Sequence, residues 1–94
     1  MSHCIDIDGI RVSTDHFIDG QRVASPERFA DHSPIDGRLI GEIASGLQEH
    51  CNAAIEAAQR AFPAWAALGP ARRAELLNRV AEELERRGDD LGRV

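Results

Sequence analysis

The spacing of apolar residues changes once along this chain, at Ser45, and this change limits the possible fold more than any other feature. Before Ser45, short runs of strand-forming residues alternate with Gly, Pro and Asp turn signals. After it, apolar residues return every three or four positions, as they do on one face of a helix. The chain is therefore predicted to form strands and turns over residues 1–44 and helices from residue 45 onward.

The first segment contains the pattern Ile-Asp-Gly-x-Arg-Val twice, at residues 7–12 and 18–23. An Asp-Gly pair between strand-forming residues is typical of a type I′ turn, which needs a positive φ at both central residues. Two interpretations are open: two short hairpins, or one hairpin preceded by a frayed copy of itself. In both, the second copy has the better strands.

A further strand pair is predicted before Ser45. Residues 28–32 read as extended, and Pro34 reinforces this by excluding the residue before it from helical conformations. Pro34 then leads a turn that includes Gly37, and residues 38–43 form the next strand.

The first helix is predicted within residues 45–68. Ser45 and Gln48 have the spacing of a capping box. Pro63 should end the regular helix near Phe62, because proline lacks the backbone N–H and clashes with the preceding turn. A short turn then returns Trp65 to the apolar face. That face comprises Cys51, Ala54, Ile55, Ala58, Ala61, Phe62 and Trp65.

The second helix is predicted within residues 69–88, opening at Gly69-Pro70 and ending at Arg86-Arg87-Gly88. Residues 89–94 read as the start of a truncated helix. The second helix's apolar face comprises Leu76, Leu77, Val80, Ala81 and Leu84. The acid-first pairs at four-residue spacing are Glu56–Arg60, Glu75–Arg79, Glu82–Arg86 and Glu83–Arg87. The predicted fold class is α/β, with N-terminal β-hairpins followed by two antiparallel amphipathic helices.

Composition excludes several classes of function. The 94 residues suit one small domain, and the net charge of −5 argues against nucleic acid or an anionic membrane as partner. All 11 basic residues are Arg, so lysine-dependent chemistry, including a Walker phosphate loop, is excluded for this chain. No apolar run approaches the length of a membrane span, and no signal peptide is visible. Two Cys fit a reducing, cytoplasmic compartment better than a disulfide scaffold.

Three patterns could carry chemistry, and each has a simpler explanation. His3-Cys4 and His50-Cys51 could suggest zinc, but adjacent ligands do not have the spacing of a structural zinc site. Cys51 as a nucleophile would need exposure beside positive charge, whereas its position predicts a core residue, with His50 on the solvated surface. Asp6 and Asp8 resemble the start of a calcium loop, but the remaining ligands are missing and a hairpin turn explains them. No catalytic, cofactor-binding or metal-binding residue is therefore predicted.

Four segments, in order, carry a resemblance to a known family. They are His16-Phe17-Ile18-Asp19-Gly20; Ser33-Pro34-Ile35-Asp36-Gly37-Arg38-Leu39-Ile40; Ala54-x-x-Ala57-Ala58-x-x-Ala61-Phe62-x-x-Trp65; and Arg73 followed by Leu76-Leu77 and the helix to Leu91. Together they resemble the N-terminal part of NAD(P)-dependent aldehyde dehydrogenases, over residues 16–91. Ser33 stands where the family commonly has Asn. Within this family, the four segments most resemble those of the 2-hydroxymuconic and 5-carboxymethyl-2-hydroxymuconic semialdehyde dehydrogenases.

The resemblance implies that residues 1–94 are the incomplete N-terminal part of an aldehyde dehydrogenase and belong to its cofactor-binding domain. The parent protein would oxidise a small-molecule aldehyde, such as a semialdehyde of aromatic catabolism, to a carboxylic acid with NAD or NADP. It would be a cytoplasmic homo-oligomer without nucleic-acid or membrane partners. The family's nucleophile, general base and phosphate-binding turn would lie beyond Val94, so this chain alone would be a non-catalytic scaffold. The alternative is a small, self-contained protein-interaction module with no enzymatic activity.

Overall fold

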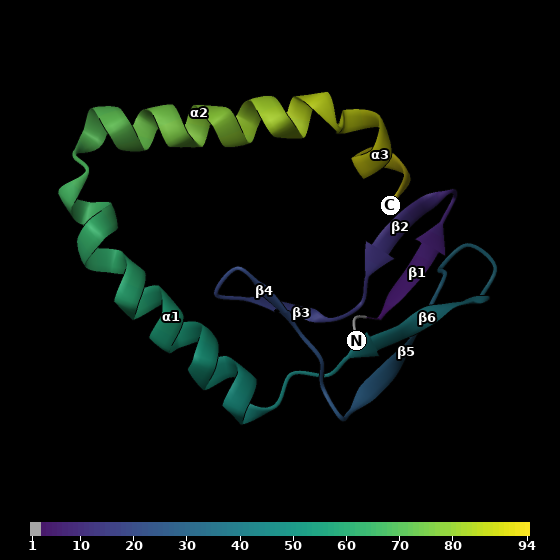
Figure 1. Ribbon diagram of the computed structural model, residues 1–94. Helices are drawn as coiled ribbons and strands as arrows, with labels where there is room; N and C mark the ends of the chain where they lie inside the picture. The colour runs from purple at the N-terminus through teal and green to yellow at the C-terminus, as the bar shows by residue number, and fades with distance from the viewer. Residues whose placement is uncertain (1–2) are drawn as a thin grey trace.

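A computed structural model of the protein describes residues 3–94, which form six strands followed by three helices (Figure 1). The elements are β1 (Cys4–Ile7), β2 (Ile10–Ser13), β3 (His16–Ile18), β4 (Gln21–Val23), β5 (Arg28–His32), β6 (Leu39–Ala44), α1 (Gln48–Ala67), α2 (Pro70–Arg86) and α3 (Gly88–Arg93). The strands pair in sequence order as three separate two-stranded antiparallel sheets. The fold is therefore a mixture of hairpins and helices, as the change of spacing predicts.

Both copies of the repeated pattern form hairpins. Asp8 and Gly9 have φ values of 56° and 85°, and Asp19 and Gly20 have φ values of 53° and 75°, so both turns have the predicted positive φ pair. The expectation that the second hairpin has the better strands is wrong. Four residue pairs join β1 to β2, and only three join β3 to β4. The first ladder continues through the Thr14 N–H, which donates to the His3 carbonyl over 3.0 Å.

The turn between β5 and β6 is closed by backbone bonds in both directions. Ser33 N–H donates to the Arg38 carbonyl over 2.8 Å, and Gly37 N–H donates to the Ser33 carbonyl over 2.9 Å. Gly37 has a φ of 77°, which a residue with a Cβ rarely adopts. The predicted turn and the extended residues before it are confirmed.

The first hairpin crosses β6 at Gly41. A Cβ atom added at Gly41 would lie 2.7 Å from the Cγ2 atom of Ile5, so only glycine leaves room for this side chain. The contact places β1 against β6 and joins the first and third hairpins.

Helix α1 begins two residues later than a cap at Ser45 would require. Its N-cap is Leu47, whose backbone N–H donates to Nδ1 of His50 over 3.0 Å. Ser45 serves the strand junction instead: its N–H donates to the Glu27 carbonyl, and its carbonyl accepts from Oγ of Ser25, both over 2.8 Å. The predicted capping box at Ser45 is wrong because tertiary contacts already occupy that backbone.

The predicted end of the first helix near Phe62 is also wrong. Helix α1 continues through Pro63 to Ala67, and Trp65 stays on the helix rather than on a separate turn. Four of the seven residues from Ala61 to Ala67 are Ala, the strongest helix former, which offsets the hydrogen bond that Pro63 cannot make. Helix α2 then opens at Gly69-Pro70 as predicted, with Gly69 at a φ of 81°.

The helices end and pair differently from the expectation. Gly88 does not adopt a positive φ; it is the first residue of α3. Of the four predicted acid–base pairs, the structure has Glu83–Arg87 at 2.7 Å. Arg86 also pairs with Glu83, so the side chain of Glu83 bridges two guanidinium groups. Two residues of the other predicted pairs have different partners: Glu75 pairs with Arg72 over 2.7 Å, and Arg60 pairs with Asp19 on the second hairpin over 3.2 Å.

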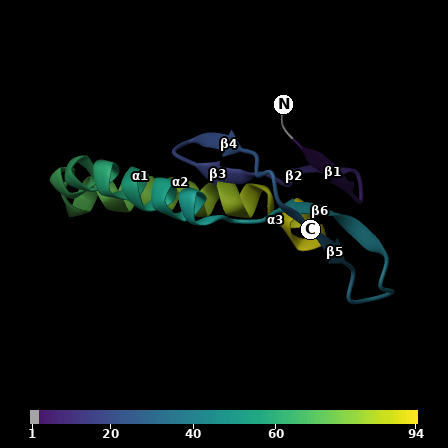
Figure 2. The ribbon, with the colours of Figure 1, turned by 90° about the horizontal axis from the view of Figure 1, so that it is seen from below.

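Helices α1 and α2 diverge from Gly69 and do not pack along their lengths (Figure 1). In the perpendicular view α1 and α2 overlap (Figure 2). The expected antiparallel helix pair is therefore not formed; α1 instead contacts β3, and α2 contacts α3. Ala44 is the one buried apolar residue among residues 3–94. The buried polar residues are Thr14, Asp15, Ser25, Ser33 and His50. No helix in the described part of the chain is long and apolar enough to cross a membrane.

Candidate functional site

The side chain of Asp15, between β2 and β3, lies at the centre of a cluster of hydrogen bonds. Its Oδ2 atom accepts the backbone N–H of His3 over 2.9 Å, and its Oδ1 atom lies 3.0 Å from Nδ1 of His3 and 3.2 Å from Nη1 of Arg28. The side chain is 1% exposed. The backbone N–H of His3 lowers the pKa of this carboxyl most, opposed by desolvation and helped by Arg28 and the His3 ring.

Arg28 extends this cluster to the other hairpins. Its Nη2 atom donates to Oγ1 of Thr14 over 2.5 Å and to the Glu42 carbonyl over 2.8 Å. Both oxygens of Asp15 are engaged by these neighbours, so the carboxylate is held as a structural anion and is not placed to take a proton from a substrate. The cluster joins His3, which precedes β1, and strands β5 and β6 to the segment between β2 and β3.

Sequence reasoning did not single out Asp15 or Arg28. A signal was present: Asp15 is not followed by Gly, unlike Asp8 and Asp19, so a turn does not explain it. The partners of Asp15 lie 12 and 13 residues away, and no local pattern identifies them.

A second polar feature joins β3 to the start of α1. The imidazole rings of His16 and His50 have their centroids 4.6 Å apart. His50 is 9% exposed, and the buried Nε2 atom of His16 has no hydrogen-bond partner among residues 3–94. An open pocket of about 320 Å³ adjoins the two rings and is also lined by Phe17, Leu47 and Cys51.

These positions reverse two expectations: Cys51 is exposed and His50 is buried. The reason for the burial of His50 is the cap, because its ring turns toward the Leu47 N–H and packs on His16, whereas Cys51 lines the open pocket beside β3. His3 is bound to Asp15, and Cys4 is exposed. No group of three His, Cys, Asp or Glu side chains within residues 3–94 lies close enough to hold a metal ion.

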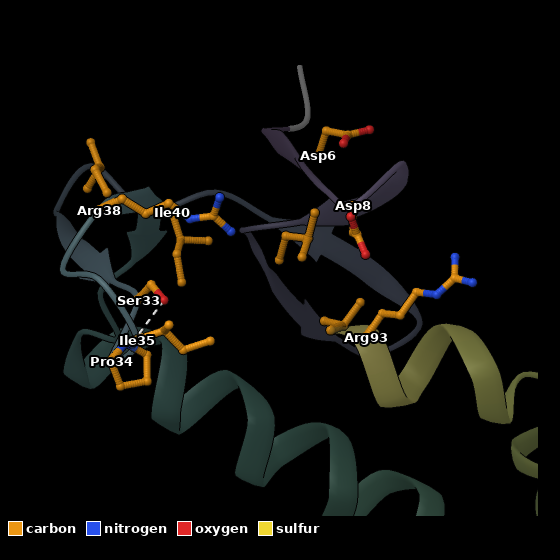
Figure 3. Close-up of a pocket in the computed structure, with 11 residues that line it drawn as sticks. Asp6, Asp8, Ser33, Pro34, Ile35, Arg38, Ile40 and Arg93 are labelled. Atoms are coloured by element: carbon orange, nitrogen blue, oxygen red, sulfur yellow. Dashed lines mark hydrogen bonds between the residues drawn. The ribbon is translucent and has the colours of Figure 1, made fainter.

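Figure 3 shows a cavity of about 420 Å³ between the β1–β2 turn, the β5–β6 turn and the end of α3. Its lining mixes apolar side chains such as Ile35 and Ile40 with polar ones such as Asp8 and Ser33, and Asp6 and Arg93 point away from its centre. Oδ1 of Asp6 accepts the Gly9 N–H over 2.9 Å, so this carboxylate closes the hairpin turn, as the simpler explanation of the calcium-like pattern requires.

An apolar hollow lies between the end of α1 and α2. It has a volume of about 550 Å³ and is lined by Trp65, Leu76, Val80 and Leu84, with Arg79 and Glu83 also in its lining. We call it the α2 groove. Val80 is 55% exposed and Leu84 is 54% exposed, so the predicted apolar face of this helix is present but is not covered by any of residues 3–94.

Comparison with known proteins gives this geometry its context. The chain matches the aldehyde dehydrogenase family over residues 21–94 and belongs to that family. It is 42% identical to a vanillin dehydrogenase of Pseudomonas fluorescens over 66% of this chain and 13% of that protein. It is 34% identical to the 5-carboxymethyl-2-hydroxymuconate semialdehyde dehydrogenase of Escherichia coli, over 74% of this chain and 15% of the relative.

A third relative is the 2-aminomuconic 6-semialdehyde dehydrogenase of a Pseudomonas species, 36% identical over 80% of this chain and 16% of the relative. The chain thus spans about one sixth or less of the length of these relatives. No solved structure matches the chain.

Aldehyde dehydrogenases generally use NAD or NADP. The start of α1 is therefore compared with a helix N-terminus that binds the pyrophosphate of a dinucleotide. A pyrophosphate binds at a helix N-terminus whose backbone N–H groups are free and which a glycine turn leaves open. At this helix start the imidazole of His50 accepts the N–H of the N-cap residue, Leu47, and a Cβ added at Gly46 would meet the His16 ring at 3.8 Å, which is van der Waals distance.

Proposed function

We propose that this chain is the N-terminal part of an enzyme that oxidises an aldehyde to a carboxylic acid with NAD or NADP. The observation that carries the proposal is the family match over residues 21–94. The length of the relatives supports it, since each is several times longer than 94 residues. In this proposal residues 1–94 form the incomplete beginning of an aldehyde dehydrogenase domain and belong to its cofactor-binding part.

The role of this segment in that enzyme is that of a scaffold without catalytic, cofactor-binding or metal-binding residues. Three observations support this role. Both oxygens of Asp15 are held by His3 and Arg28. The N-terminus of α1 is capped by His50. The apolar side chains of α1 and α2 are exposed, which suits helices that pack against further chain. Those side chains are Ile55, Phe62, Trp65, Leu77, Val80 and Leu84.

The proposed substrate class is the aldehydes of aromatic catabolism. The relatives named above are a vanillin dehydrogenase and two muconic semialdehyde dehydrogenases. The enzyme is further proposed to be a cytoplasmic homo-oligomer that acts on a small molecule.

A second proposal is a self-contained interaction module that uses the α2 groove to bind another protein. The exposure of Val80 and Leu84 is the observation that favours it. The two proposals differ in the size of the native protein, because only the first requires a much longer chain.

The first experiment is the intact mass of the native protein in its source cells, detected with an antibody raised against residues 69–88. A mass several times 10.3 kDa supports the enzyme, and a band at 10.3 kDa supports the module. The protein purified on that antibody is then assayed for formation of NADH or NADPH with vanillin and with a hydroxymuconic semialdehyde. Turnover of neither compound, nor of a panel of simple aldehydes, would overturn the enzymatic proposal.

A further inference from the structure

We propose that His16 and His50 form a proton-sensitive joint that holds the start of α1 against β3 while both imidazoles are neutral. The inference concerns the attachment of this helix and does not depend on the enzymatic proposal. It rests on the hydrogen bond of one imidazole, the buried nitrogen of the other, and the contact between the two rings.

The hydrogen bond at His50 sets the protonation state of its ring. The Leu47 backbone N–H can only donate, so Nδ1 of His50, 3.0 Å away, must be an unprotonated acceptor. A proton added to the neutral ring occupies this same Nδ1 atom and places two donors face to face. The bond that caps α1 is therefore lost on protonation, and a positive charge appears at the positive end of the helix dipole.

Protonation of His16 is also unfavourable while α1 is held against β3. Its Nε2 atom is buried and lacks a hydrogen-bond partner among the described residues. The protonated form of His16 would carry N–H at that atom and would bury an unpaired donor of a charged group. With the ring centroids only 4.6 Å apart, two charged imidazoles would also repel each other.

Among residues 3–94, no charged side chain is bonded to the imidazole of His16 or His50. Glu49 lies in the first turn of α1, and the Cys51 thiol lines the adjoining pocket. Asp19 and Arg60 pair with each other between the β3–β4 turn and α1, 3.2 Å apart. Asp15, next to His16, is bonded to His3 and Arg28. Proton uptake by the pair therefore weakens the contact between β3 and α1.

The test is hydrogen–deuterium exchange of the full protein that carries these residues, followed in a peptide covering residues 45–56. Rates are corrected for the intrinsic effect of pH on exchange, and a peptide from the middle of α2 is the internal reference. Between about pH 7.5 and about pH 5.5, the range in which histidine titrates, protection at the start of α1 should fall about five- to tenfold, the effect of losing one cap. Protection in α2 should not change. Equal protection at both pH values would overturn the proposal.

Variants assign the effect to the two rings. His50→Gln keeps an acceptor at the third helical position but does not titrate, so protection should persist at low pH. His32→Gln, on exposed β5, is the matched control and should behave as the unaltered protein does. An unchanged pH dependence in His50→Gln would overturn the proposal.

Two further variants cover the remaining outcomes. If His50→Gln does not protect the helix start at any pH, His50→Glu decides the question. In His50→Glu the helix start should lose its protection about two pH units lower than in the unaltered protein, because the ordinary pKa of glutamate is about two units below that of histidine. If the midpoint of this loss does not move, the result is evidence against the joint. His16→Phe should make the transition shallower, because one proton is taken up instead of two. If the loss of protection in His16→Phe depends on pH as steeply as in the unaltered protein, His16 does not take up a proton with His50, and the proposal is overturned.

Discussion

Ile5 lies so close over Gly41 that a Cβ atom on the glycine would fall 2.7 Å from Cγ2 and 3.2 Å from Cδ1 of Ile5. The first hairpin therefore rests on β6 through a contact that only glycine permits. Gly41→Ala should lower the free energy of unfolding by about 1–3 kcal/mol, the usual cost of overpacking.

Denaturant unfolding of the protein measures this effect. Gly92→Ala is the matched control, because nothing lies within 4 Å of its added Cβ. In the double variant Ile5→Ala/Gly41→Ala the clash is gone, so it should lose less than the sum of the two single changes. Strict additivity would show that the two residues do not meet as described.

The carboxyl of Asp15 links stability to acid. Because its pKa is lowered in the folded state, its contribution is present above the unfolded pKa, about 3.9, and is lost as the pH falls through the lower folded value. Asp15→Asn should reduce stability at neutral pH and flatten the loss of stability in acid. The measurement is the free energy of unfolding between about pH 7 and about pH 2. Asp8→Asn, in an exposed turn that Asn tolerates, should retain the acid dependence. The same acid slope in both variants would contradict this role for Asp15.

Pro63 interrupts the hydrogen bonds of α1 without ending the helix. Pro63→Ala should raise the free energy of unfolding by about 1–3 kcal/mol, because the N–H that proline lacks becomes available to the preceding turn. Pro70→Ala is the control at the first position of α2, where that N–H has no helical acceptor, and should change stability little. Circular dichroism and thermal unfolding compare the two. A gain at Pro70 as large as that at Pro63 would be inconsistent with a continuous α1.

The two proposed functions predict different effects of a substitution in the α2 groove on the free energy of unfolding. In the isolated 94-residue chain Leu84 is 54% exposed, and Leu84→Ala should change the free energy of unfolding by at most about 0.5 kcal/mol. In a longer enzyme that covers this face, the same change should cost about 2–5 kcal/mol. Glu85→Ala on the same helix controls for helix propensity. Equal, small effects of Leu84→Ala in both proteins would argue against burial of the groove by further chain.

The apolar faces also predict how the isolated chain behaves. With Ile55, Phe62 and Leu77 exposed, the 94-residue chain should associate or remain loosely packed in solution. Sedimentation velocity and near-ultraviolet circular dichroism measure the two behaviours. A monomer with a sharp two-state unfolding transition would contradict the expectation and would favour the self-contained module.

The sequence alone determined the elements whose causes are local. The Asp-Gly turns, the Pro34–Gly37 turn and the start of α2 at Gly69-Pro70 depend on the φ preferences of one or two residues, and all are observed. The family resemblance was also readable, since four short segments stand in the right order along the chain. One local prediction was wrong at Pro63, where the surrounding alanines favour the helix more strongly than one proline disfavours it.

The tertiary structure determined which partners the backbone groups and the charged side chains bind. Ser45 does not form the predicted capping box, because its backbone N–H donates to the carbonyl of Glu27, 18 residues earlier. Arg60 pairs with Asp19, 41 residues away, rather than with Glu56. Asp15 is buried by His3, just before β1, and by Arg28 on β5. Periodicity reports which residues share a face, but burial depends on what lies opposite that face. For this reason the pattern could place Cys51 on an apolar stripe, while only the contact between His16 and His50 determined which side of α1 is covered.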